Sequence, residues 1–286
     1  MVKNVFQFEA MTTPCEVVIF LQDNLKAKAI ANEILHNTKR LEKKYNYFSK
    51  DSFISKLNNR IENKLDNETK ELLQKGKLFY TKTNGIFDIT IATIKPLYKL
   101  KTLKELEKEK EALLPYLGCE HFALKKEKLL FDNPFTMVDL GGMVKEFAVD
   151  EAVKILKKSK VSHGIINFGG DLYALGTKPN GEKFTVGIKN PHNPKENITK
   201  IQLENEALTT SAHYERNFTI EGESFSHIIL TKKVTVNTIS ATVISPATLL
   251  SGVYSTALLC DETLHTPYKT LTIKSNMELH YENFNR

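Results

Sequence analysis

The spacing of apolar residues changes along this chain, and that change limits the folds open to it more than any other feature. From Asn24 to Tyr45, apolar residues recur at roughly helical spacing with Lys and Glu between them, which predicts one long amphipathic helix. A second helix is expected from about Glu68 to Thr83, because Asn84-Gly85 is a suitable C-terminal stop. The stretch from Lys99 to Leu114, dense in Lys, Glu and Leu, predicts an exposed helix.

Both flanks of this helical region contain the shorter β-branched and aromatic runs that are typical of strands. At the start, Phe6–Phe8 and Glu16–Leu21 predict a hairpin with its turn at Thr12-Thr13-Pro14. Beyond Asp139 we expect helices at Asp150–Lys158 and Pro246–Leu259, and strands at Ile165–Phe168, Phe184–Ile188, Phe218–Ile220, Val234–Val236 and Ala241–Ile244. No repeat of fixed period and no linker rich in Gly, Pro or Ser divides the chain, so residues 1–286 are expected to form a single domain or two intimate halves.

The charged residues argue against a nucleic-acid partner. The chain has 40 Lys and Arg against 34 Asp and Glu, a formal charge of +6, but its basic residues are interspersed with acidic ones. That pattern is typical of an ordinary solvated surface, and no nucleic acid is expected to bind. A mild positive field would still attract an anionic ligand such as a dinucleotide.

The cysteines and the first residues bear on the cellular compartment. Cys15, Cys119 and Cys260 stand far apart and lack the paired spacing of a zinc site or a disulfide framework, which favours a reducing compartment. The segment from Met1 to Glu9 carries an acid where a signal peptide needs an apolar core, and no stretch approaches the length of an integral membrane segment. As written, the sequence predicts a soluble, cytoplasmic protein, and a periplasmic location only if a leader has been removed.

Glycine pairs are the first candidates for a ligand site. Neither the Gly-x-Gly-x-x-Gly dinucleotide fingerprint nor a Walker-type phosphate loop occurs, so any nucleotide must be held by other means. Gly141-Gly142 follows Val138-Asp139-Leu140, and Gly169-Gly170 precedes Asp171. A glycine pair allows backbone amides to approach an anion closely, although each pair alone is more often a tight turn.

The order of several short blocks is more specific than any single motif. These blocks are Asn84–Thr90, Val138–Lys145 with Ala148–Asp150, Ile165–Leu172, Leu208–Ser211, Ser226–Ile229 and Ser255–Leu258. In this order the chain resembles the ApbE family, the FAD:protein FMN transferases, from Met11 to about Leu259. The resemblance implies an α+β, ApbE-like fold with mixed sheets packed with helices.

The resemblance also assigns residues to the flavin and to the adenosine half of FAD. Met11 and Phe48 match residues that lie against the flavin, and Ile229 belongs to the matching Ser-His-Ile element. Met11 could instead fill the core, and an aromatic ring such as that of Phe48 could cap it. Ile86 and Phe87 match the loop on the adenine and ribose side.

Three charged residues complete the implied FAD contacts. Asp88 belongs to the same adenine-side loop, although alone it would be read as a turn residue. Asp139 matches an FAD-contacting acid, and Lys145 can approach the diphosphate, although a lone lysine is ordinarily solvated. An acid at the edge of a glycine turn is not expected in the core, so replacing Asp139 by Ala should weaken FAD binding without unfolding the chain.

A magnesium site is implied by the same resemblance. Gly142 matches a position whose main-chain carbonyl helps to bind Mg²⁺, and Ser255 and Thr256 match hydroxyl donors on the last helix. Oxygen ligands suit this hard cation, which commonly bridges protein and phosphate. A small helix-packing pair is the alternative reading of Ser255 and Thr256.

The chain departs from the family pattern at three places. Gly252 stands where the family has a metal-binding aspartate, and Leu230–Lys233 replaces an Asp-Pro and a Thr-Gly turn. Glu146 replaces a glycine, which places an acid near the proposed phosphate path. Positions 252 and 256 share a helix face, so Gly252→Asp is expected to raise magnesium affinity without destabilising the fold.

The implied reaction is transfer of FMN from FAD to a Ser or Thr hydroxyl of an acceptor flavoprotein, with AMP as leaving group. His227 is the candidate base, with His213 as runner-up, and a structural histidine is the alternative. A second hypothesis, favoured by Gly252, is a catalytically impaired FAD-binding carrier or assembly protein. A third is an FAD diphosphatase, which would need the metal but no protein acceptor.

Overall fold

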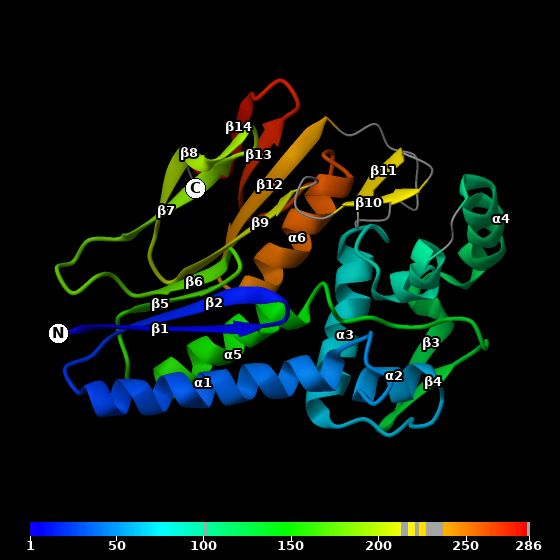
Figure 1. Ribbon diagram of the computed structural model, residues 1–286, viewed down its shortest axis with the longest axis horizontal. Helices are drawn as coiled ribbons and strands as arrows, with labels where there is room; N and C mark the ends of the chain where they lie inside the picture. The colour runs from blue at the N-terminus through cyan, green and yellow to red at the C-terminus, as the bar shows by residue number, and fades with distance from the viewer. Residues whose placement is uncertain (100–101, 213–216, 221–222, 227–236, 285–286) are drawn as a thin grey trace.

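The computed structural model describes residues 1–99, 102–212, 217–220, 223–226 and 237–284 (Figure 1). Its central feature is an eight-stranded sheet in the order β1-β2-β5-β6-β9-β12-β13-β14, with antiparallel neighbours throughout. The strands are β1 (Lys3–Ala10), β2 (Thr13–Phe20), β5 (Gly164–Phe168), β6 (Asp171–Leu175), β9 (Glu206–Ala212), β12 (Thr238–Ser245), β13 (Lys269–Lys274) and β14 (Leu279–Glu282). Strands from the two ends of the chain therefore form the opposite edges of one sheet.

Helices and three separate hairpins surround the sheet. The helices are α1 (Asn24–Tyr45), α2 (Phe53–Asn58), α3 (Asn67–Lys82), α4 (Leu103–Leu113), α5 (Val144–Lys158) and α6 (Thr248–Cys260), with 3₁₀ turns η1 (Ile89–Thr93), η2 (Lys95–Lys99), η3 (Leu114–Tyr116) and η4 (Cys119–His121). The hairpins are β3 (Phe122–Lys125) with β4 (Lys128–Phe131), β7 (Phe184–Asn190) with β8 (Asn193–Leu203), and β10 (Asn217–Ile220) with β11 (Glu223–Ser226).

The two faces of the sheet pack against different partners. On one face, α1 and α5 lie side by side and α6 packs on β9 and β12 (Figure 1). On the other face, the β7–β8 hairpin contributes apolar residues to a separate buried cluster. Adjacent residues of β12 illustrate the division: Val243 packs in the cluster that contains α6, and Ile244 packs in the cluster that contains β8. This is the alternation expected of a strand buried on both sides.

Most of the predicted helices are confirmed. The first helix has the predicted bounds, and Asp23 caps it by accepting a hydrogen bond from the amide of Lys26. The second matches α3 to within a residue at each end, and the exposed helix α4 begins at Leu103, later than expected. The predicted start at Asp150 is wrong, because α5 begins at Val144 with no side-chain cap that a sequence would reveal.

The opening hairpin is confirmed, but its turn is displaced. Met11 and Thr12 form the turn, both with positive φ (53° and 60°), and Thr13 and Pro14 already belong to β2. Among the later predictions, the strand at Val234–Val236 lies outside the described residues. No helix in the described part of the chain is long and apolar enough to cross a membrane.

Candidate functional site

The candidate site is centred on the N-terminus of α5, where Gly141 and Gly142 are exposed. The segment before the glycine pair is held in place by Asn58. The side-chain amide of Asn58 donates to the carbonyl of Val138 and its oxygen accepts from the amide of Val138, both at 2.8 Å. Asn58 is a buried positioning residue that sequence reasoning missed, because its partner lies far along the chain.

Asp139 shapes the turn before α5. One carboxylate oxygen accepts a hydrogen bond from the amide of Gly141 at 2.8 Å, and the other pairs with Lys95. Its own amide donates to the carbonyl of Ile89 at 2.8 Å. Only 4% of the side chain is exposed. The expectation that Asp139 lies outside the core is therefore wrong, because it is a buried, ion-paired group. That Asp139→Ala weakens FAD binding without unfolding the chain stays a prediction.

Phe48 presents an open aromatic ring near Asp139. It is 85% exposed, so the reading of this ring as a cap on the core is wrong. The ring meets Tyr47 edge-on at 5.5 Å, and Lys95 Nζ lies 5.2 Å from the Tyr47 centroid and 5.9 Å from the Phe48 centroid. Lys95 thus joins the aromatic pair to the carboxylate of Asp139. Burial, and then the charge of Asp139, raises the pKa of Tyr47.

The loop after α3 borders the same glycines. The Phe87 ring is buried, and it lies 3.5 Å from the point where a Cβ on Gly142 would stand. Asp88 caps η1, accepting hydrogen bonds from the amide and the hydroxyl of Thr90 at 2.7 Å each. Burial raises the pKa of Asp88. Ile86 packs against the buried cluster that includes residues of α6.

Lys145 and Met11 lie near the start of β2. Lys145 forms an ion pair of 2.6 Å with Asp171, the first residue of β6. The alternative of a merely solvated lysine is therefore wrong. The amide of Met11 donates to the carboxylate of Glu42 at 2.6 Å. Burial raises the pKa of Cys15 to about 11, with opposite contributions from Lys145 and Glu42, which places both charges near this thiol.

Helix α6 carries three small residues on one face, Gly252, Ser255 and Thr256. The hydroxyl of Ser211, on β9, lies 2.9 Å from the Ser255 hydroxyl and 3.2 Å from the Thr256 hydroxyl. Ser255 also donates to the carbonyl of Gly252 at 3.0 Å. Ser255 is fully buried, which agrees with a packing role, whereas Thr256 is partly open.

Glu146 points into the interface between α5 and α6. It is 7% exposed, and a Cβ built on Gly252 would stand 2.5 Å from its Cγ and 3.0 Å from its Cδ. Gly252→Asp therefore fits only if Glu146 moves, so the expectation that this substitution leaves the fold undisturbed is wrong. That Glu146 places an acid near the phosphate path stays a prediction. Burial, followed by the charge of Asp171, raises the pKa of Glu146.

Asp150, one helical turn beyond Glu146 on α5, caps α6 from outside. Its two carboxylate oxygens accept hydrogen bonds from the amides of Thr248 (2.7 Å) and Leu249 (3.0 Å). Burial raises the pKa of Asp150, although these two hydrogen bonds act in the opposite direction. The sequence places Asp150 in a motif but does not reveal this role, since the α6 cap position itself is Ala247.

The remaining candidates lie outside the described residues: His227, His213 and Ile229. Among the residues that are described, no three His, Cys, Asp or Glu side chains are grouped so as to hold a metal ion. A cation here would have to use main-chain carbonyl and hydroxyl oxygens besides any carboxylate. The Gly169–Gly170 pair forms the β5–β6 turn, with φ of 63° and 100°.

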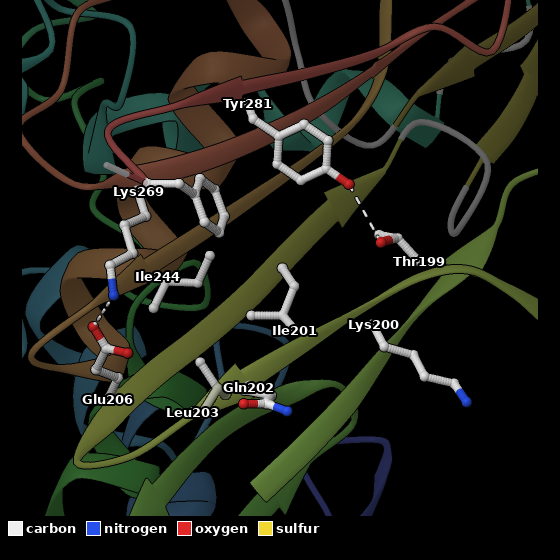
Figure 2. Close-up of a pocket in the computed structure, with 10 residues that line it drawn as sticks. Thr199, Lys200, Ile201, Gln202, Leu203, Glu206, Ile244, Lys269 and Tyr281 are labelled. Atoms are coloured by element: carbon white, nitrogen blue, oxygen red, sulfur yellow. Dashed lines mark hydrogen bonds and ion pairs between the residues drawn. The ribbon is translucent and has the colours of Figure 1, made fainter. Parts of the chain in front are cut away.

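A separate hollow of about 310 Å³ lies on the opposite face of the sheet (Figure 2). It is lined by residues of β8, β9, β12, β13 and β14, with Ile201 and Ile244 at its floor and the Lys269–Glu206 ion pair at one end. Tyr281 closes the other end through a 3.3 Å hydrogen bond to Thr199. The sheet separates this hollow from α5 and α6, so it is not part of the candidate site.

Solved structures share the fold of this chain. It superposes on the ApbE protein of Thermotoga maritima with a TM-score of 0.87 at 23% identity, covering 99% of this chain and 97% of the other. The apo flavinyl transferase ApbE of Pseudomonas stutzeri gives a TM-score of 0.82 at 19% identity, covering 99% and 95%. These likenesses confirm the predicted α+β fold.

Sequence relatives carry a common name. The FAD:protein FMN transferase of Chlamydia pneumoniae is 23% identical over 233 residues, which cover 78% of this chain and 72% of the relative. That of Vibrio cholerae is 21% identical over 245 residues, covering 82% and 73%. The model of the ApbE family matches residues 11–266, a span that includes both the glycine pair before α5 and the hydroxyl-bearing face of α6, and the chain therefore belongs to the ApbE family.

Proposed function

We propose that the protein is an FAD:protein FMN transferase. One observation carries this proposal: relatives with that name align with the chain over more than two thirds of their own length, within a family match that covers most of the chain. We also propose that residues 1–286 act as a single domain, because strands from both ends of the chain share one sheet.

FAD would lie across the N-terminus of α5. The helix end offers partial positive charge to a diphosphate, and the exposed Gly141–Gly142 pair leaves room for it. Lys145 adds a cation on one flank. The open ring of Phe48 can stack on isoalloxazine. We place Met11 on the flavin side, Ile86, Phe87 and Asp88 on the adenosine side, and Ile229 among the FAD contacts.

Mg²⁺ is the cation we propose for this site. Its oxygen ligands would be the carbonyl of Gly142 and the hydroxyls of Ser255 and Thr256, and the rest of its shell would come from phosphate and water, as is usual for this ion. The donor chemistry fits, because Thr256 remains partly open and Ser211 holds both hydroxyls in place. When bound, the ion would spread the negative charge of the diphosphate.

We propose the following reaction. The hydroxyl oxygen of an acceptor Ser or Thr attacks the phosphorus on the FMN side of FAD, and the bond from that phosphorus to the bridging oxygen breaks. AMP leaves with the bridging oxygen, and His227 takes the proton of the hydroxyl. Lys145 orients the diphosphate. The acceptor is another protein, and we propose that its modified residue is Ser or Thr.

The deciding experiment follows AMP and protein-bound flavin after incubation with FAD and Mg²⁺, with and without an acceptor peptide. A transferase releases AMP and labels the peptide in equal amounts. Release of AMP together with free FMN, without labelling, would identify a diphosphatase. Binding of FAD with no AMP would identify a carrier and contradict the proposal.

A further inference from the structure

We infer that Glu146, on α5, supplies the carboxylate ligand of the divalent cation at the face of α6. The inference deepens the proposed function and rests on it. It assigns to this chain an anionic ligand that the position of Gly252 does not provide.

The carboxylate of Glu146 is buried. Glu146 is 7% exposed, and within the described part of the chain its Oε2 accepts no hydrogen bond from an N–H or hydroxyl group, although the carboxyl of Asp171 lies close enough to share a proton with that of Glu146. Buried carboxylate oxygens are normally hydrogen-bonded, ion-paired or bound to metal, because a bare buried charge is costly. In the metal-free protein a proton shared with the carboxyl of Asp171 can satisfy this oxygen, and a bound cation would take the place of that proton.

The side chain of Glu146 points toward α6. Glu146 occupies the space beside Gly252 that any other residue at 252 would fill with its own Cβ. On α6, positions 255 and 256 lie on the same face as position 252, one turn further on. The carboxylate of Glu146 therefore lies against the face of α6 that carries the Ser255 and Thr256 hydroxyls.

Glu146 lies among charged side chains. The charge of Asp171 raises the pKa of Glu146, and Lys145 forms an ion pair of 2.6 Å with Asp171. With both acids ionised, these three side chains leave one negative charge in a buried place. A divalent cation would compensate that charge, and burial of a carboxylate with its cation is the usual arrangement in proteins.

Asp150, the next acid on this face of α5, differs from Glu146 in its hydrogen bonds. Asp150 lies on the same face of α5 and is also turned toward α6, but both of its oxygens accept hydrogen bonds from α6 amides. Asp150 is thus committed to holding the helix. It provides a matched control: a carboxylate on the same helix face with no spare oxygen.

The test measures metal binding directly. Mn²⁺ is titrated into the protein saturated with FAD, and free Mn²⁺ is followed by electron paramagnetic resonance. Glu146→Gln keeps the shape and removes the charge, and it should weaken Mn²⁺ binding by about 10-fold or more. Asp150→Asn should lower the melting temperature while the Mn²⁺ affinity stays that of the wild type.

Moving the carboxylate between the helices gives an independent arm. Gly252→Asp alone should lower the melting temperature, because its side chain meets Glu146. Combined with Glu146→Gly, the same substitution should restore both the melting temperature and the Mn²⁺ affinity. This double variant also keeps the inference testable if Glu146→Gln does not fold.

Wild-type Mn²⁺ affinity in folded Glu146→Gln would overturn the inference, and so would a double variant that folds but binds no Mn²⁺. Neither outcome bears on whether the wild type transfers FMN. Absence of AMP release by the wild type, with Mn²⁺ binding still dependent on Glu146, would overturn the proposed function and leave the ligand assignment standing.

Discussion

At the scale of single residues, Asp139 shows that an acid beside a ligand site can belong to the fold. It closes the turn before α5 and pairs with Lys95 while almost fully buried. We expect Asp139→Ala to lower the free energy of unfolding by about 1–3 kcal/mol, because it leaves the Gly141 amide and the Lys95 ammonium without their partner. Urea denaturation measures this. Unchanged stability with weakened FAD binding would show that Asp139 is a ligand contact only.

Phe48 is the opposite case, a large apolar side chain that the fold does not use. Because its ring is 85% exposed, Phe48→Ala should leave the melting temperature unchanged. It should weaken FAD binding by about 1 kcal/mol, or roughly fivefold, through loss of stacking. Quenching of flavin fluorescence gives the affinity. Leu25→Ala, at another exposed apolar position, is the control. Equal affinity in Phe48→Ala and the control would place the flavin elsewhere.

The sequence predicts which residues gather at the site better than it predicts how they face. Motif order points to Gly142, Lys145 and Thr256. The structure places Gly142 in the turn before α5, Lys145 on α5 and Thr256 on α6, and the two helices contact one another. The sequence does not predict that the side chain of Glu146 packs against Gly252, because that contact joins residues far apart in the chain. The roles of His227 and Ile229 stay predictions, as do the proposed metal ligands.

At the scale of elements, the packing of α5 against α6 depends on Asp150. Ala247 provides no side-chain cap for α6, so the carboxylate of Asp150 takes that place. Asp150→Ala should therefore lower the free energy of unfolding by about 1–2 kcal/mol, as for loss of a cap. Chemical denaturation checks the value. Glu151 lies beside it and, among the described residues, is ion-paired with Lys154 alone, so Glu151→Ala should change stability by less than about 0.5 kcal/mol. Equal losses would argue against the cap.

Elements were predictable where local signals were complete. For α1, regular apolar spacing and the Asp23 cap agree, and the predicted bounds hold. For α5, Met143 gives no capping signal, so the first turns were missed. Strand β8 was missed because most of its first half, from Asn193, is exposed and carries no alternation. Its pairing with β7 comes from the hairpin and from its buried end near Leu203.

At the scale of the whole molecule, three buried thiols report on how many units unfold. Cys15 lies on β2, Cys119 on η4 and Cys260 at the end of α6. Burial raises the pKa of Cys15 to about 11 and that of Cys260 to about 12, and it also raises the pKa of Cys119. At pH 8 the native thiols are therefore protonated and shielded, and they should react slowly with Ellman's reagent.

If residues 1–286 are one domain, all three thiols should become reactive over the same narrow range of denaturant. Mass spectrometry of the labelled peptides assigns each thiol to its transition. Two separate transitions would instead indicate two halves that unfold independently. Raising the pH toward 11 should speed labelling of native Cys15, since its thiolate form appears there.

The contact between Glu146 and Gly252 also constrains the history of such a chain. A lineage that gained the acid on α5 while keeping one on α6 would pass through a crowded, doubly charged interface, and one that lost the α6 acid first would pass through a site with no acid at all. Both single steps are disfavoured, so the two positions should be inherited as a pair. A descendant that alters one of them alone should survive only where a third substitution nearby makes room or restores the charge.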